Sequence, residues 1–115
     1  MGELPISIQV DATAKFQKKI KSLEKKYRNI KDDVRQIVDS IAIGELPGDR
    51  ITDLNLEIYK VRIKNSNNHK GKSSGYRLIY YVKTIERVIL VTIYSKSEQE
   101  DIEQNEIEDI IAEFE

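Results

Sequence analysis

Residues 58–64 read IYKVRIK and residues 76–94 read YRLIYYVKTIERVILVTIY, and these two stretches carry the clearest structural pattern in the 115-residue chain. In the first stretch, positions 59, 61 and 63 are apolar or aromatic, whereas positions 60, 62 and 64 are Lys or Arg. Successive side chains of a strand point to opposite faces, so the stretch predicts a strand with one cationic face. The second stretch predicts two apolar strands, 76–83 and 88–94, which a turn joins into a hairpin.

Helical patterns lie on both sides of these strands. Residues 16–27 and 34–41 each carry an apolar stripe at helical spacing, and the short connection between them predicts an antiparallel helix hairpin. A short alternating segment at 6–10 predicts a first strand. A last helix is expected after a capping box at 97–100 or from residue 105, and its apolar stripe consists of Ile107, Ile110, Ile111 and Phe114.

The order of these elements, β-α-α-β-β-β-α, predicts an α+β fold in a single domain over residues 1–115. The helix hairpin should pack on one face of a small, mostly antiparallel sheet, and the other face should stay free for the cationic strand residues. The chain has no cysteine, no apolar run long enough to span a bilayer and no secretory pattern at its start. We therefore expect a soluble, cytoplasmic protein with no membrane association.

Charge is distributed unevenly along the chain. Residues 60–96 contain nine Lys or Arg and one acid, whereas residues 97–115 contain nine acids and no base, although the net charge is only -1. A local cationic surface favours a ligand rich in phosphate. We expect the acidic end to form a solvated helix face or to fold over the cationic surface. In the second case, deleting residues 105–115 would raise RNA affinity, whereas loss of the fold would show that the stripe is core.

The candidate site is the set of residues that converge if the three central strands are neighbours: Lys60, Arg62, Arg77, Tyr94 and Lys96. Lysine and arginine can bind a phosphate, and a tyrosine can stack on a base or relay a proton. RNA cleavage by the ribose 2′-hydroxyl requires few further groups, and a lysine beside other cations could serve as base or acid. The alternative is that these cations only keep an exposed sheet face soluble.

Several other chemistries are excluded or disfavoured. His69 is the only histidine, so a mechanism with two histidines is impossible. The acids after residue 97 lack the order of a calcium loop, and we expect neither a metal nor a cofactor. The segment Gly71-Lys72-Ser73 is not a P-loop, because the earlier glycine would have to be Ser66. Tyr76, Tyr80 and Tyr81 fit sheet packing better than function.

Three segments together resemble the RelE/HigB family, within the RelE/ParE superfamily of bacterial type II toxins. They are YKVRI at 59–63, KGKSSGYRLIYY at 70–81 and IYSKSE at 93–98, and the Lys-rich helix at 16–27 is also similar. The resemblance implies a metal-independent endoribonuclease that enters the ribosome and cuts messenger RNA. It also implies a cognate antitoxin as partner.

The resemblance implies roles for individual residues. Lys60 and Arg62 match cations that contact and activate the RNA, Arg77 matches an arginine that stabilises the scissile phosphate, and Lys96 lies where a further cation is kept. The expected RNA-binding surface around them consists of Lys64, Lys70, Lys72 and Tyr76.

The chain also departs from the family pattern. A second catalytic arginine would fall at about Ser97, and a catalytic tyrosine near Ile102 or Glu103. Lys96 and Tyr94 would then substitute, as in the HigB-like branch. Two alternatives therefore stay open: an inhibitor of DNA gyrase similar to ParE toxins, or a catalytically inactive module that binds RNA or antitoxin.

Overall fold

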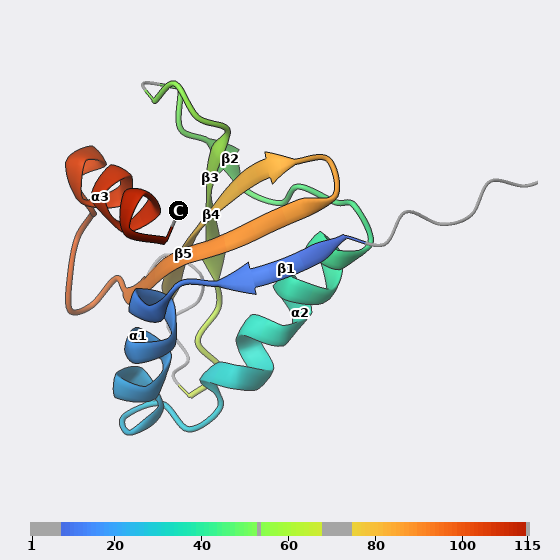
Figure 1. Ribbon diagram of the computed structural model, residues 1–115. Helices are drawn as coiled ribbons and strands as arrows, with labels where there is room; N and C mark the ends of the chain where they lie inside the picture. The colour runs from blue at the N-terminus through green and yellow to red at the C-terminus, as the bar shows by residue number, and fades with distance from the viewer. Residues whose placement is uncertain (1–7, 53, 68–74, 115) are drawn as a thin grey trace, which may run out of the picture.

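A computed structural model describes residues 8–52, 54–67 and 75–114 (Figure 1). The elements in chain order are β1 (Gln9–Ala12), α1 (Ala14–Glu24), α2 (Ile30–Ala42), β2 (Asp49–Arg50), β3 (Ile58–Ile63), β4 (Tyr76–Thr84), β5 (Arg87–Ser95) and α3 (Gln104–Phe114). The expected α+β fold and element order are confirmed. The two-residue strand β2 is an addition that the sequence pattern does not indicate.

The strands form one mixed sheet in the order β1-β5-β4-β3-β2. Strand β1 runs parallel to β5, whereas the β2–β3, β3–β4 and β4–β5 pairs are antiparallel. The three strands that carry the candidate residues are therefore adjacent, with β4 in the middle. Figure 1 shows β1 at one edge of the sheet, beside β5.

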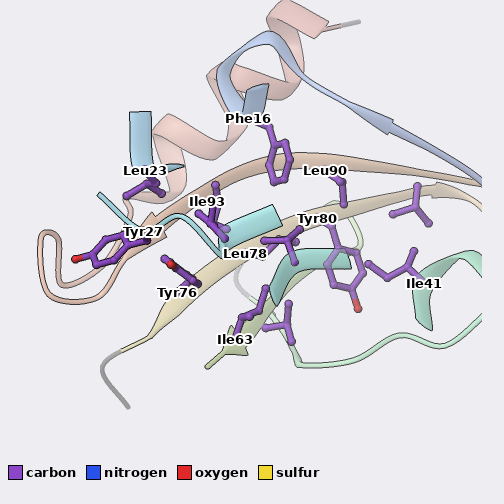
Figure 2. Packing of buried hydrophobic residues seen from close by; sticks show 14 residues of the cluster. Phe16, Leu23, Tyr27, Ile41, Ile63, Tyr76, Leu78, Tyr80, Leu90 and Ile93 are labelled. Carbon is purple, nitrogen blue, oxygen red and sulfur yellow. The ribbon is translucent and has the colours of Figure 1, made fainter. Parts of the chain in front are cut away.

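Helices α1 and α2 pack on one face of the sheet and close the larger apolar core. This core contains Phe16 and Leu23 of α1, Ile30 and Ile41 at the two ends of α2, and strand residues such as Tyr76. The rings of Tyr27 and Tyr76 meet edge to face with centroids 5.7 Å apart, as Figure 2 shows. The helix hairpin therefore covers one face, as the sequence predicts.

The opposite face is not left free, which corrects the sequence-based expectation. A second apolar cluster there joins Ile58, Ile79 and Ile89 to the apolar stripe of α3, in which Ile107 is only 1% exposed. Helix α3 begins at Gln104, so the capping-box pattern at 97–100 does not start a helix. Because the stripe is core, deleting residues 105–115 should disrupt the fold and is not a test of RNA affinity.

A bulge in β5 determines which residues share the uncovered part of this face. Ile79 pairs with Thr92 while Tyr80 pairs with Leu90, so Val91 is an extra residue in β5. Strand alternation alone would put Tyr94 on the same face as Leu90, toward α1 and α2. The extra residue reverses this, and Tyr94 faces the same side as α3.

Within the described part of the chain, none of the helices is long and apolar enough to cross a bilayer.

Candidate active site

Arg62, Arg77 and Tyr94 form a row across the three central strands. Arg62 of β3 lies opposite Arg77 of β4, which lies opposite Tyr94 of β5. Directly opposed residues in an antiparallel pair have side chains on the same face, about 5 Å apart at Cβ. The row is the floor of a cleft of about 460 Å³, lined by Lys60, Arg62, Arg77, Tyr94, Lys96, Asp49, Arg50, Ile51, Glu100 and Asp101. The structure therefore brings the five candidate residues into one cleft.

Arg77 is the most buried cation of the cleft, at 6% exposure. Its Nη1 donates a hydrogen bond to the Tyr76 carbonyl oxygen at 3.1 Å, which fixes the guanidinium against β4. Burial lowers the pKa of Arg77, the charge of Arg62 lowers it further, and Tyr94 opposes both effects. An arginine remains charged even so. The cleft therefore holds a fixed cation whose position favours an anionic ligand.

Tyr94 is a neutral hydrogen-bond donor in the cleft. It is 2% exposed, and its hydroxyl donates to Oδ1 of Asp101 at 3.2 Å. Burial, the charge of Asp101 and this hydrogen bond raise the pKa of Tyr94 to about 12, and Arg77 lowers it only in part. At neutral pH, Tyr94 can therefore donate a proton or a hydrogen bond.

Asp101 is a site residue that the sequence analysis missed. Its Oδ1 accepts a hydrogen bond from Nζ of Lys60 at 2.9 Å and from the backbone N–H of Ile102 at 2.8 Å, besides that from Tyr94. The hydrogen bond from Lys60 is the largest of several effects that lower the pKa of Asp101. No sequence pattern distinguishes this position, because Asp101 is one of nine acids in residues 97–115.

The segment after β5 brings these acids back to the cleft. Nζ of Lys96 donates to the Glu100 carbonyl oxygen at 2.5 Å, and Asp101 follows directly. Lys60 therefore faces a carboxylate, not only other cations.

The residues expected to form the surrounding RNA surface have different positions. Lys64 is exposed just after β3, whereas Lys70 and Lys72 lie outside the described residues. Tyr76 is completely buried in the core beneath α1 and α2, on the face opposite the cleft. This corrects its assignment to the RNA-binding set, because a core side chain cannot contact RNA in this structure.

Ser97 and Glu103, the residues at which the chain departs from the family pattern, do not line the cleft. Oγ of Ser97 lies 2.9 Å from Oγ of Ser95 and 3.4 Å from the hydroxyl of Tyr27. Glu103 lines a neighbouring, more open depression together with Asp101 and Ile102. Among the residues that the structure describes, no group of three or more His, Cys, Asp or Glu has a geometry that could hold a metal ion.

Comparison with known proteins gives one relevant finding. A family model described as the RelE toxin of the RelE / RelB toxin-antitoxin system matches residues 12–113. This range includes α1, α2, all of α3 except Phe114, and every residue that lines the cleft. No curated protein matches the chain significantly.

Proposed function

The chain belongs to the RelE toxin family, and we propose that it is an endoribonuclease that cuts messenger RNA on the ribosome. Family membership makes it a toxin of a toxin–antitoxin system, with an antitoxin as its partner. The ribosome and messenger RNA as targets, and cleavage as the reaction, are the parts we propose.

The observation that carries the proposal is the direct opposition of Arg62 and Arg77. Like charges directly opposite each other destabilise a sheet, and here one of the two is 6% exposed. A bound phosphodiester would neutralise this repulsion. A pentacoordinate phosphorane carries more negative charge than the diester, so fixed cations stabilise the transition state more than the ground state.

Each of the five candidate residues then has a specific role. Lys60 and Arg62 contact the RNA backbone, and Arg77 stabilises the charge that develops on the scissile phosphate. Tyr94 donates its proton to the departing 5′-oxygen, and Lys96 adds a cation at the end of the row. Lys64 extends the RNA surface, together with Lys70 and Lys72. The 2′-hydroxyl is the nucleophile, so the products are a 2′,3′-cyclic phosphate and a 5′-hydroxyl.

The test is primer extension on messenger RNA translated in vitro, with the protein present or absent and with ribosomes present or omitted. We expect cuts only when both protein and ribosomes are present. Arg77→Ala should reduce the cleavage rate by about 10²–10³-fold, which is typical for loss of one group that stabilises a developing oxyanion. A folded Arg77→Ala variant that cleaves as fast as the wild type would remove the core of the proposal.

The matched control is Arg35→Ala. Arg35 is an exposed arginine of α2, on the other face of the sheet, and it pairs with Asp32 at 3.8 Å. This substitution removes the same charge outside the cleft and should leave cleavage unchanged. Growth arrest with DNA damage and intact messenger RNA would indicate a gyrase inhibitor. A folded product without growth arrest would indicate an inactive binding module.

A further inference from the structure

We propose that Asp101 is the general base that removes the proton from the ribose 2′-hydroxyl. The assignment rests on the proposed ribonuclease function and adds a catalytic residue to it. Asp101 lies in the segment between β5 and α3, 41 residues from Lys60 in sequence, and lines the cleft beside Tyr94. Neither its position in the chain nor the composition of its surroundings indicates such a role.

Few groups of the cleft can accept a proton from the 2′-hydroxyl. A general base must be unprotonated at the working pH and within reach of the hydroxyl. Arg50, Arg62 and Arg77 are permanent cations, and Lys60 is paired with a carboxylate. Tyr94 holds its own proton until strongly alkaline pH. Nζ of Lys96 donates a hydrogen bond to the Glu100 carbonyl oxygen. Among the described residues lining the cleft, the other titratable groups are the carboxylates Asp49, Glu100 and Asp101.

The hydrogen bonds of Asp101 distinguish it from the other two carboxylates of the cleft. Its carboxylate is hydrogen-bonded to two proposed catalytic side chains, Lys60 and Tyr94. These bonds and the one from the Ile102 N–H converge on Oδ1 and fix the orientation of the group. Within the described part of the chain, no donor is hydrogen-bonded to Oδ2. The carboxylate is therefore held by one oxygen and has the other available to accept a proton.

The reaction balances with these two groups. The 2′-oxygen attacks phosphorus while its proton moves to Oδ2 of Asp101, and the bond from phosphorus to the 5′-oxygen breaks. The 5′-oxygen takes the proton of the Tyr94 hydroxyl. Oδ2 of the exposed Asp101 side chain then releases its proton to water, and the Tyr94 oxygen takes up a proton from water. Both residues end in their starting protonation states, and no further reactant is consumed.

The competing explanation is that Asp101 only occupies the phosphate site as an internal anion. A carboxylate paired with Lys60 would then compete with RNA for the same cation. The two explanations predict opposite effects of Asp101→Asn, which removes the charge but keeps the shape. If Asp101 is the base, cleavage slows by about 10²–10⁴-fold, the usual contribution of general acid–base catalysis. If Asp101 is only a competitor, cleavage accelerates.

The experiment measures single-turnover cleavage of a synthetic messenger RNA in the ribosomal A site by wild type, Asp101→Asn and Glu98→Gln. Glu98→Gln is the matched control, because it removes one negative charge from the same segment at an exposed residue that pairs with Lys26. We expect wild-type rates for the control. Binding of an uncleavable 2′-O-methyl RNA should be unchanged or tighter in Asp101→Asn, so that the loss is confined to the rate.

A second substrate distinguishes two roles of Asp101: general base, or a residue that only positions Tyr94. Replacing the bridging 5′-oxygen by sulfur gives a leaving group that departs without a proton. This substrate should restore fast cleavage to Tyr94→Phe, which lacks the acid. Asp101→Asn should stay slow on it, because the 2′-hydroxyl must still lose its proton. Recovery of both variants would overturn the base assignment and make Asp101 a positioning residue.

The outcomes keep the two proposals distinguishable. A wild-type protein that cleaves neither substrate overturns the ribonuclease function, and the base assignment falls with it. Wild-type cleavage with an equally fast or faster Asp101→Asn overturns the base assignment alone. The Asp101 side chain is 66% exposed, so we expect the variant to fold. Asp101→Glu supplies a second check, because it keeps a carboxylate and should recover part of the lost rate.

Discussion

Tyr94 shows how two opposite charges act on one buried hydroxyl. Asp101 accepts its hydrogen bond and favours the protonated form, whereas the positive charge of Arg77 favours the tyrosinate. Burial is the largest effect and acts in the same direction as Asp101, so the proton is held more tightly than in solution. The same contacts that make Tyr94 a poor base at neutral pH keep its proton available for a departing alkoxide.

The raised pKa of Tyr94 predicts a loss of stability at alkaline pH. The folded-state pKa of Tyr94 is about 12 and the ordinary pKa of tyrosine is 10.0, so between these values the unfolded chain releases a proton that the folded chain keeps. Stability is therefore fully present below pH 10 and falls as pH rises toward 12, by on the order of 2 kcal/mol. Tyr94→Phe removes this contribution, so its free energy of unfolding should fall less steeply across this window.

The measurement is urea unfolding of both proteins at a series of pH values from 9 upward. The other tyrosines, including buried Tyr76 and Tyr80, are common to both proteins and cancel in the comparison. Equal slopes in the wild type and Tyr94→Phe would contradict the raised pKa of this residue.

At the scale of elements, the bulge in β5 explains why the site was only partly predictable. The pattern at 58–64 and the position of Arg77 at the start of β4 place Arg62 and Arg77 together by simple alternation. Alternation along β5 alone would place Tyr94 with Leu90, in the core under α1. The extra residue Val91 reverses this, and nothing in the run VILVTIY marks it. Asp101 could not be predicted because its partner Lys60 lies 41 residues away in the sequence.

Some of the other elements could be predicted from local sequence, whereas others depend on contacts between distant residues. The helix hairpin follows from apolar spacing, which is local, and it is confirmed. Strand β2 depends on Gly48, whose φ of +93° turns the chain where an added Cβ would lie 2.4 Å from the Lys60 carbonyl oxygen. The face of the sheet that α3 covers depends on the whole sheet, and the expectation of a free face was therefore wrong.

The bulge predicts a structural role for Thr13, the N-cap of α1. Its Oγ1 donates to the Val91 carbonyl oxygen at 2.6 Å and accepts from the Phe16 N–H at 3.0 Å. Thr13→Val keeps the shape of this 2% exposed side chain but loses both hydrogen bonds. We expect a loss of about 1–3 kcal/mol in the free energy of unfolding, from the helix cap and the buried carbonyl left unpaired.

Thr13→Ser is the control, because serine keeps the hydroxyl and loses only a methyl group. Denaturant unfolding of the three proteins measures the effect, and a Val variant as stable as the Ser variant would contradict it. Thr13→Val should also slow RNA cleavage, because the extra residue Val91 is what places Tyr94 on the cleft side of the sheet.

At the scale of the whole molecule, two groups of positive charges lie on opposite faces of the sheet. Lys60, Arg62, Arg77 and Lys96 line the cleft on the α3 side of the sheet. Helix α1, on the opposite side, carries Lys15, Lys18, Lys19 and Lys21 with one acid, Glu24. A net charge of -1 hides both surfaces. RNA affinity should therefore depend on which surface loses a charge and not on the net charge.

Salt dependence tests this distinction with two variants of equal net charge. Arg62→Gln and Lys18→Gln each remove one exposed cation and take the net charge from -1 to -2. For single-stranded nucleic acid, each phosphate neutralised contributes about -0.7 to the slope of log affinity against log salt. Arg62→Gln should make the slope for an uncleavable 2′-O-methyl RNA less negative by about 0.7. Lys18→Gln should leave it unchanged, and equal changes in both variants would show that RNA responds to overall charge and not to the cleft.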